Sequence, residues 1–312
     1  MRIIYFGTPE FAVPTLRTLI DSSHEVIALV SQPDRPRGRG QHLSPTATKV
    51  LAESKGVRVL QPERIKDEGF LPTIVSLAPD LGVVAAYGKI LPESLLQIPR
   101  LGMVNVHASL LPRWRGAAPV HRAVIAGDRQ TGVTIMRVVK ELDAGPMFAT
   151  VSRAIGPDET SPDVERDLSE AGASLLLDVV DRLAAGEAIE TPQDDSRATY
   201  APKIVKTEGT IDWGLPAQQV HNLVRGLQPW PLVSARLGDT RVLVHRTALA
   251  NEHTPEAAGT IVRAERDALD VAAGDGLIVR ILILQPEGRR AMTAREFLAG
   301  HAIAAGSRLE RG

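Results

Sequence analysis

Residues 2–31 decide the class of fold. They open with Arg2-Ile-Ile-Tyr-Phe6, an apolar run typical of a buried strand, and close with Val26-Ile-Ala-Leu-Val30, a second run of the same kind. Between the two runs the apolar residues recur at helical spacing, at Phe11, Leu16, Leu19 and Ile20. A strand, a helix and a second strand in this order predict a right-handed βαβ unit, in which the two strands are parallel.

The same alternation continues along the chain as far as residue 185. Helices are expected near 45–55 and 160–185, and further strands at 57–60, 79–86, 102–108, 131–139 and 147–154. Strands that alternate with helices in this way are typical of α/β folds. We therefore expect an α/β, Rossmann-like, mostly parallel sheet with helices on both of its faces.

The remainder of the chain has a different pattern. Periodicity fades from about residue 187, and Thr191-Pro-Gln-Asp-Asp-Ser-Arg197 is typical of an exposed connector. After a helix at 216–226, short runs of alternating apolar and polar residues predict a smaller C-terminal β-barrel of the OB-like type. The expected organisation is a first domain at 1–189, a linker at 190–206 and a β-barrel domain at 207–312.

The composition narrows the class of protein. Of the 312 residues, 44% are hydrophobic and 23% are charged, and the net charge of -1 gives no general attraction to nucleic acid. The chain has no cysteine, which excludes disulfides, thiolate metal sites and a cysteine nucleophile. No apolar run reaches the about 20 residues of a membrane span, and because the first residues already have a strand pattern we expect no targeting segment. We expect a cytoplasmic protein without membrane contact, and a monomer, because no long apolar stripe is left unassigned.

The turn after the first strand, Gly7-Thr-Pro-Glu-Phe-Ala-Val-Pro14, argues against a nicotinamide cofactor. A dinucleotide-binding turn needs three glycines, for the tight turn, the approach of the pyrophosphate and close helix packing. This turn has one glycine, two prolines without N–H donors, and a glutamate that repels phosphate. The spacing of a P-loop is absent as well, and the histidines lack the spacing of a metal site, so we also expect no metal.

Two polar residues interrupt the strand expected at 102–108. Asn105 and His107 are two positions apart, so their side chains share one face of the strand. Burial of such groups without partners costs about 1–3 kcal/mol each, so a compensating role is expected. They lie at the carboxyl end of a late strand, where open α/β sheets bind their ligands. The alternative is a structural pair that bonds to neighbouring backbone.

A carboxylate follows in Glu141-Leu-Asp-Ala-Gly-Pro146, in a loop between two expected strands, although Asp-Ala-Gly-Pro is also ordinary turn chemistry. An amide, an imidazole and a carboxylate together suit the attack of an amine on a carbonyl group. Asn105 can donate to the developing oxyanion, and His107 can stabilise that charge or move a proton. Asp143 can orient the histidine or help to take the amine proton. Since the chain has no cysteine and no Gly-x-Ser-x-Gly turn, transfer without an acyl-enzyme is favoured.

The stretch Asn105-Val-His-Ala-Ser-Leu-Leu-Pro112, with Arg113-Trp-Arg-Gly-Ala-Ala-Pro119 directly after it, resembles the core motif of the 10-formyltetrahydrofolate-dependent formyltransferases. The resemblance runs from Met1 to about Arg308 and is strongest to members that act on methionyl-tRNA. Further matching blocks follow in family order, at 6–14, 32–40, 86–92, 132–136, 142–145, 211–213 and 228–231. One departure is Ala144, where a threonine often precedes the glycine.

The resemblance implies that 1–189 is the catalytic domain, that Asn105, His107 and Asp143 are catalytic, and that 10-formyltetrahydrofolate is the co-substrate. The pterin would lie against the turn and the loop formed by Ser109, Leu110, Leu111, Pro112, Tyr87 and Gly88. The acceptor would be the α-amino group of methionine on initiator tRNA, and Phe11 would help to form the aminoacyl pocket.

Arg35, Arg37 and Arg39 occupy alternate positions of a Pro/Gly-rich loop. Arginine donates to phosphate oxygens in a planar fork, and the resemblance implies that this loop enters the acceptor stem of the tRNA. A solvated loop without a ligand is the alternative. Lys203 and Lys206 in the linker are further expected tRNA contacts. The barrel domain is expected to contact tRNA too, although its 12 arginines are balanced by 12 acidic residues and it has no lysine.

Two other classes of function remain open at this point: transfer of the formyl group to a different acceptor, and RNA binding without catalysis. A formyltransferase that acts on a UDP-linked amino sugar would have a similar two-domain layout, and the arginine loop favours tRNA over it. A formyltransferase that acts on a glycinamide ribotide would lack the second domain. A non-catalytic RNA-binding protein, from another class, would have no use for Asn105, His107 and Asp143.

Overall fold

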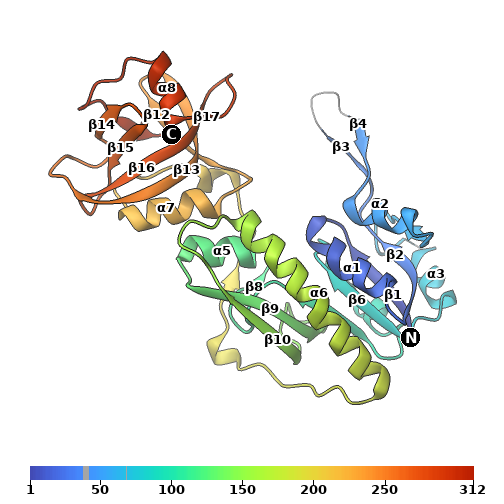
Figure 1. Cartoon of the computed structure of the whole chain (residues 1–312). Helices are drawn as coiled ribbons and strands as arrows, with labels where there is room; N and C mark the ends of the chain where they lie inside the picture. Colours follow the sequence, from blue (N-terminus) through green and yellow to red (C-terminus); the bar gives the residue numbers. More distant parts are fainter. Residues whose placement is uncertain (38–41, 68) are drawn as a thin grey trace. The chain divides into compact units, whose positions relative to one another are not determined.

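The computed structural model describes residues 1–37, 42–67 and 69–312, and the chain divides into two compact units. The first unit comprises Met1–Pro119, Gln130–Arg153 and Glu165–Ala201. The second unit comprises Val120–Arg129, Ala154–Val164 and Pro202–Gly312. Figure 1 shows the course of the chain with its elements labelled.

The first unit is built on a seven-stranded sheet with the strand order β10-β9-β7-β6-β1-β2-β5. Its strands are β1 (Arg2–Gly7), β2 (Glu25–Val30), β5 (Val59–Leu60), β6 (Leu81–Ala85), β7 (Met103–His107), β9 (Gln130–Arg137) and β10 (Met147–Ala154). The five neighbouring strands from β7 to β5 are parallel, and β9 pairs with β7 in the antiparallel sense. The expected mostly parallel α/β sheet is thus confirmed.

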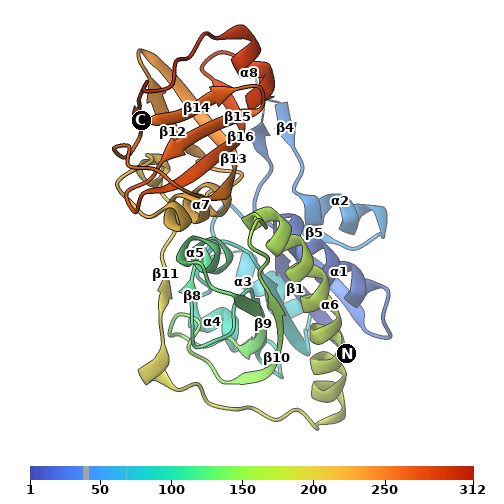
Figure 2. The ribbon, with the colours of Figure 1, turned by 60° about the vertical axis from the view of Figure 1, so that its left-hand side comes forward.

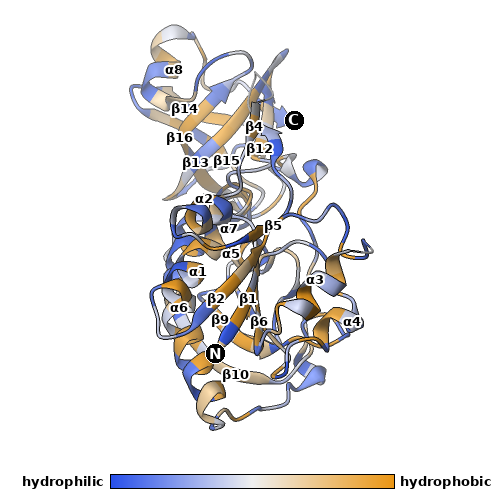
Figure 3. Ribbon diagram, turned by 90° about the vertical axis from the view of Figure 1, so that its right-hand side faces the viewer, coloured by the Kyte–Doolittle hydropathy of each residue, from blue (hydrophilic) through white to orange (hydrophobic). Residues whose placement is uncertain are grey.

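Helices cover both faces of this sheet (Figure 3). On one face lie α1 (Val13–Ile20), which follows the 3-10 turn η1 (Glu10–Ala12), α2 (Ala47–Ser54) and the long helix α6 (Ser161–Ala185). On the other face lie α3 (Phe70–Ser76) and α4 (Glu93–Leu96).

The central strand β1 is buried on both faces, which explains why its sequence is continuously apolar rather than alternating. Ile4 and Phe6 pack in one cluster with Phe70, Ile74 and Leu95 from the helices α3 and α4. Tyr5 faces the other side, where its hydroxyl donates to the carbonyl oxygen of Ala12 at 2.8 Å, next to α1.

Several short elements were not predicted from the sequence. The arginine-rich segment contains a small hairpin, in which β3 (Arg35–Arg37) pairs with β4 (His42–Ser44). A two-residue strand β8 (Arg115–Gly116) pairs in parallel with β11 (Tyr200–Ala201), as Figure 2 shows, just after the turn η2 (Asp195–Arg197). The exposed connector therefore contributes a strand to the region that directly follows the turn at 109–114.

The second unit contains an antiparallel sheet with the order β14-β15-β16-β13-β12-β18, and β17 pairs with β16 beside it. The strands are β12 (Val233–Leu237), β13 (Thr240–His253), β14 (Ile261–Glu265), β15 (Ala268–Ala272), β16 (Leu277–Pro286), β17 (Met292–Thr293) and β18 (Leu309–Arg311). A bridge between Thr260 and Arg308 joins the two edges of this sheet, so the sheet curls round as a barrel does. The expected β-rich second domain is confirmed.

Helices complete the second unit: α5 (Pro119–Ala126), α7 (Ala217–Gly226), α8 (Ala294–Gly300) and the turn η3 (Lys206–Gly209). The helix α8 begins at a capping box, in which Thr293 accepts from the backbone of Glu296 and the Glu296 carboxylate accepts from the backbone of Thr293. Arg122 of α5 forms a two-pronged ion pair with Glu208, and this hydrogen-bonded pairing lowers the pKa of Glu208 below its usual range. Among the described residues, no helix combines the length and the apolar character needed to cross a membrane.

Candidate active site

Asn105 and His107 lie at the carboxyl end of β7 and share one face of the strand, as their spacing predicts. The register of the sheet places Asn105 opposite Met136 of β9 and His107 opposite Thr134. On the other side of β7, Asn105 is paired with Val84 of the parallel strand β6. The backbone at Asn105 is therefore paired on both sides, and that at His107 is paired with β9.

His107 is held in one protonation pattern by a backbone carbonyl. Its Nε2 atom lies 2.9 Å from the carbonyl oxygen of Trp114, and since a carbonyl can only accept, Nε2 must carry a proton. The other ring nitrogen, Nδ1, lies 3.8 Å from the Oδ2 atom of Asp143. The side chain of His107 is only 5% exposed, so solvent does not compete strongly for these two positions. In the neutral ring, Nδ1 is therefore the basic nitrogen.

Asp143 stands in a strained loop between β9 and β10. Its φ of 48° is left-handed, which costs a non-glycine residue about 1–2 kcal/mol. Its Oδ2 atom accepts a hydrogen bond from the backbone N–H of Gly116 at 2.8 Å. Two residues later, a Cβ at Gly145 would lie 2.0 Å from the carbonyl oxygen of Arg137, so only glycine fits. The loop is thus built to bring this carboxylate beside His107.

Gly116 has a related constraint. Its φ is +119°, and a Cβ at this position would lie 2.8 Å from the carbonyl oxygen of Ala201 in β11. A glycine here allows β8 and β11 to approach and leaves the N–H of residue 116 pointing at Asp143.

The side-chain amide of Asn105 has no hydrogen-bond partner among the described residues, and it is only partly buried. A buried amide without a partner is unfavourable, whereas one that meets a ligand oxygen is stabilised. Its N–H groups are therefore available to an oxygen that enters this end of the sheet.

The turn after β7, from Ser109 to Pro112, is tied down by Thr134. The Thr134 hydroxyl donates to the carbonyl oxygen of Ser109 at 2.7 Å and accepts from the backbone N–H of Leu111 at 3.2 Å. The Ser109 hydroxyl donates in turn to the carbonyl oxygen of Arg113 at 2.6 Å. Ser109 and Leu111 are buried, and Leu110 and Pro112 are partly exposed. Thr134 was not singled out from the sequence, although the block 132–136 contained it.

Tyr87 and Gly88 lie just after the parallel strand β6, and the side chain of Tyr87 is turned into the core. The Tyr87 ring is 2% exposed and packs edge-on against Phe6, with 5.5 Å between the ring centroids. Its hydroxyl has no partner among the described residues, and burial raises the pKa of Tyr87 to about 12. Its carbonyl oxygen accepts from Gln32 Nε2 at 3.2 Å. Gly88 is exposed, so the main chain at this residue, rather than the Tyr87 ring, is free to face a ligand.

The other expected contacts fall in both units. Arg35 is exposed at the start of β3, Arg37 belongs to the same strand, and Arg39 lies outside the described residues. Lys203 and Lys206 are exposed in the second unit. Phe11 is partly buried in the turn η1.

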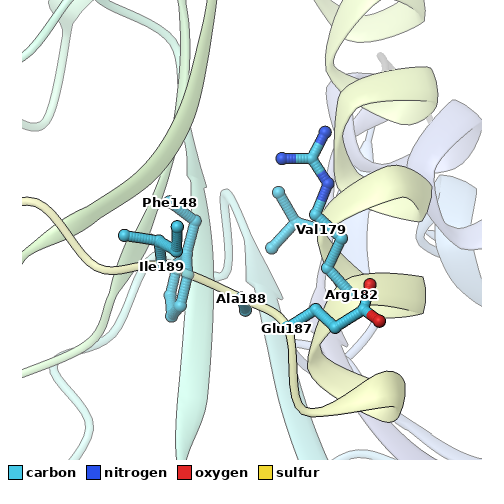
Figure 4. A pocket seen from close by; sticks show the side chains of 6 residues that line it. All are labelled: Phe148, Val179, Arg182, Glu187, Ala188 and Ile189. Atoms are coloured by element: carbon cyan, nitrogen blue, oxygen red, sulfur yellow. The ribbon is translucent and has the colours of Figure 1, made fainter.

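A small pocket of about 60 Å³ lies elsewhere in the first unit and is lined by Phe148, Val179, Arg182, Glu187, Ala188 and Ile189 (Figure 4). It contains none of the expected site residues, and ligand pockets are typically about 300 Å³ or more. We assign no ligand to it. Within the described residues, no group of three or more His, Asp or Glu side chains could hold a metal ion.

A parallel α/β sheet with a polar strand end, together with a separate antiparallel barrel, defines the class of protein: the chain belongs to the formyl transferase family. The formyl transferase profile matches residues 1–180, and that of the formyl transferase C-terminal domain matches residues 203–302.

More particular similarities lie within this family. The chain is 48% identical over 308 residues to the methionyl-tRNA formyltransferase of Geotalea uraniireducens, covering 98% of this chain and 97% of that protein. It is 43% identical over 312 residues to the protein of the same name from Halalkalibacterium halodurans, covering 100% of this chain and 97% of that one.

Solved structures share the fold. A sugar 3N-formyl transferase, solved in the presence of dTDP and 5-N-formyl-THF, has a TM-score of 0.69 at 14% identity and covers 93% of this chain and 99% of its own. HypX from Aquifex aeolicus in complex with tetrahydrofolic acid has a TM-score of 0.62 at 17% identity, covering 96% of this chain and 47% of its own. At these identities the likeness concerns the fold.

Proposed function

We propose that this formyltransferase transfers the formyl group of 10-formyltetrahydrofolate to the α-amino group of methionine on initiator methionyl-tRNA. The observation that carries the chemistry is the arrangement of three side chains at the end of β7. The Asn105 amide has no partner in the described chain, while His107 has its Nε2–H bonded to Trp114 and its Nδ1 facing Asp143. The relatives named methionyl-tRNA formyltransferase support the choice of acceptor.

The reaction begins when the uncharged amine nitrogen attacks the formyl carbon. A carbon–nitrogen bond forms, and the electron pair of the carbonyl moves onto its oxygen, to which the Asn105 amide donates. The amine loses a proton to Nδ1 of His107, the nitrogen that the Trp114 bond leaves basic. The carbon–N10 bond then breaks, and N10 of the folate takes this proton from His107. No covalent enzyme intermediate is needed.

Asp143 stabilises the doubly protonated ring of His107 during this exchange. Its Oδ2 atom lies 3.8 Å from Nδ1 of His107, so a negative charge stands beside the ring while the ring carries the transferred proton. The carboxylate itself is held by the N–H of Gly116, so it does not need to reorient when His107 gains charge. These are the roles we assign to the three catalytic residues.

The folate would lie against the turn from Ser109 to Pro112, with the main chain at Gly88 opposite it. Hydrogen bonds from Thr134 hold this turn in place before any ligand arrives, which reduces the entropy lost on binding. The buried Tyr87 ring would support Gly88 from the core side rather than contact the pterin.

The acceptor tRNA would be bound by the arginines of the β3–β4 segment, by Lys203 and Lys206, and by the second unit, and its aminoacyl end would meet Phe11. Arg35 has no ion-pair partner among the described residues, so its guanidinium is available to phosphate. We further propose that the enzyme distinguishes the initiator tRNA from the elongator tRNA. We also propose that it acts as a monomer.

A direct assay tests the proposal. The protein is mixed with 10-formyltetrahydrofolate and, in separate reactions, with initiator methionyl-tRNA, elongator methionyl-tRNA and a UDP-linked amino sugar. We expect formyl-methionine only with the initiator tRNA, and a loss of roughly 10²–10⁴ in kcat for His107→Ala with unchanged folding. Transfer to the sugar alone, or none to tRNA, would refute the assigned acceptor.

A further inference from the structure

Gln193 connects the loop of Asp143 to a buried arginine. Its Nε2 atom donates to the carbonyl oxygen of Asp143 at 2.8 Å and to that of Gly145 at 2.7 Å. Its Oε1 atom accepts from Nε of Arg115 at 3.1 Å and from Nη2 of the same residue at 2.8 Å. Both the nitrogen and the oxygen of the Gln193 amide are therefore hydrogen-bonded. This side chain, from the connector that follows α6, links the loop of Asp143 to Arg115.

Arg115 fixes the direction in which the Gln193 amide points. The Arg115 side chain is 5% exposed, and its guanidinium also donates to Oδ1 of Asp195 at 2.6 Å. Because guanidinium nitrogens only donate, they must face the amide oxygen of Gln193, and the amide N–H₂ must then face the two carbonyl groups. A flipped amide would oppose donors to donors and acceptors to acceptors. The orientation is therefore set by chemistry at both ends.

The loop that Gln193 holds needs such support. Asp143 has a left-handed φ of 48°, which a residue with a side chain adopts only where its surroundings impose it. The two carbonyl groups bonded by Gln193 flank Ala144 and thereby fix the peptide planes on both sides of the turn. A shift of this backbone would move Oδ2 of Asp143 away from the N–H of Gly116 and from Nδ1 of His107.

Arg115 also directly precedes Gly116 in β8. Gly116 donates to the Asp143 carboxylate, and Arg115 supports the Asp143 loop through Gln193. The backbone N–H of Arg115 donates to the carbonyl oxygen of Thr199 at 2.8 Å, which fastens β8 to the chain that carries Gln193. The donor to the carboxylate and the support of its loop are therefore parts of one hydrogen-bonded assembly.

We propose that Gln193 is a positioning residue, oriented by Arg115, that holds the Asp143 carboxylate at Gly116 and His107 for formyl transfer. It touches neither substrate nor the reacting atoms. This inference rests on the proposed function, because it assumes that Asp143 assists His107 in that reaction. A displacement of about 1 Å at a reacting group can cost on the order of 10²-fold in rate.

Four variants separate the proposed role from general stability. Gln193→Leu keeps the approximate size and removes both ends of the amide. Gln193→Glu keeps an acceptor for Arg115 but turns an acceptor toward the two carbonyl groups. Gln97→Leu, at an exposed glutamine after α4, is the matched control. Asp195→Asn weakens the exposed end of the Arg115 pairing and leaves Gln193 in place.

The first measurement needs no substrate. The amide proton of Gly116 reports its bond to Asp143 through its NMR chemical shift and its hydrogen-exchange rate. We expect Gln193→Leu and Gln193→Glu to shift this resonance upfield and to speed its exchange at least tenfold, whereas Gln97→Leu leaves both unchanged. Asp195→Asn should have a smaller effect than Gln193→Leu. An unchanged Gly116 amide in Gln193→Leu would overturn the proposal.

The second measurement is the steady-state rate with 10-formyltetrahydrofolate and initiator methionyl-tRNA. We expect Gln193→Leu to lower kcat by 10- to 100-fold while KM for each substrate stays within threefold and tetrahydrofolate binding is retained. A kcat within twofold of the wild-type value would overturn the role, and so would a loss that merely parallels a fall in Tm. If the wild-type protein does not formylate the tRNA, the proposed function fails, and the Gly116 measurement still decides whether Gln193 holds Asp143.

Discussion

The backbone N–H of Leu111 donates to the hydroxyl of Thr134, 23 residues further along the chain and on the neighbouring strand β9. The same hydroxyl donates to the carbonyl oxygen of Ser109, so one side chain closes two backbone hydrogen bonds of the turn after β7. A turn whose own residues cannot pair these groups depends on a partner from outside. The turn that we assign to folate binding therefore depends on a side chain of β9 for its shape.

Thr134→Val tests this dependence. The substitution keeps the shape and leaves the Leu111 N–H and the Ser109 carbonyl unpaired, so we expect a loss of about 1–3 kcal/mol in the free energy of unfolding. Movement of the turn should also raise KM for 10-formyltetrahydrofolate roughly tenfold, equivalent to about 1.4 kcal/mol of binding. Thr131→Val on the same strand is the control, because the buried Thr131 hydroxyl has no partner in the described chain. Equal losses in both variants would contradict the assignment.

Gly145→Ala should abolish most activity. The added Cβ would lie 2.0 Å from the carbonyl oxygen of Arg137, so the loop that carries Asp143 would have to move. We expect kcat to fall by at least about 100-fold, with a smaller change in folate binding. Gly300→Ala at the end of α8, where nothing lies within 4 Å of the new Cβ, should behave as wild type. Near-normal turnover by Gly145→Ala would show that the loop position is unimportant.

Glu165 makes the stability of the protein depend on pH. It is partly buried in α6, and burial raises the pKa of Glu165 to about 7. The folded state therefore binds the Glu165 proton more tightly than the unfolded chain does. This difference stabilises the folded protein fully below the pKa that Glu165 has in the unfolded chain, and the stabilisation is lost as pH rises through about 7.

Glu165→Gln removes this pH-dependent cost. We expect the variant to be more stable than wild type at pH 8 by up to about 3 kcal/mol, and the two to differ less at pH 5. Thermal unfolding at both pH values measures this, with Glu170→Gln at an exposed position of the same helix as the control. A gain that is equal at pH 5 and pH 8 would exclude ionisation of Glu165 as its cause.

The arginines of the β3–β4 segment should determine the salt dependence of tRNA binding. Combined substitution of Arg35, Arg37 and Arg39 by serine should raise KM for the tRNA, and the slope of log affinity against log salt should fall by about one for each phosphate that is no longer neutralised. A variant with the exposed Arg17, Arg58 and Lys66 replaced by serine has the same change in charge. If the slope falls equally in both variants, net charge rather than this loop is responsible.

Sequence patterns predicted the fold and the polar end of β7, because both follow from local periodicity. Continuous apolar runs identified the buried parallel strands, and the two-residue spacing of Asn105 and His107 placed both side chains on one face of β7. The helices α3 and α4 were missed because α3 contains Pro72 and α4 has only four residues, too short for a helical repeat to be visible.

The supporting hydrogen bonds were not predictable in the same way. Thr134 and Gln193 act through backbone groups 25 and 50 residues away, and no local pattern marks a threonine or a glutamine that has such a partner. The Pro/Gly content of the arginine segment likewise predicted a loop, whereas backbone pairing between Arg35 and Ser44 makes its base a hairpin.

The second unit takes Val120–Arg129 and Ala154–Val164 from within the sequence of the first. Arg122, from one of these insertions, pairs with Glu208, and Gly226 leaves so little room that an added Cβ would lie 2.4 Å from Ile125. A chimera with a single junction near residue 202 would take the two inserted segments from one relative and the rest of the second unit from the other. The contacts between these parts would then not match. Exchange of acceptor recognition between family members, in the laboratory or by recombination, must carry the two inserted segments along.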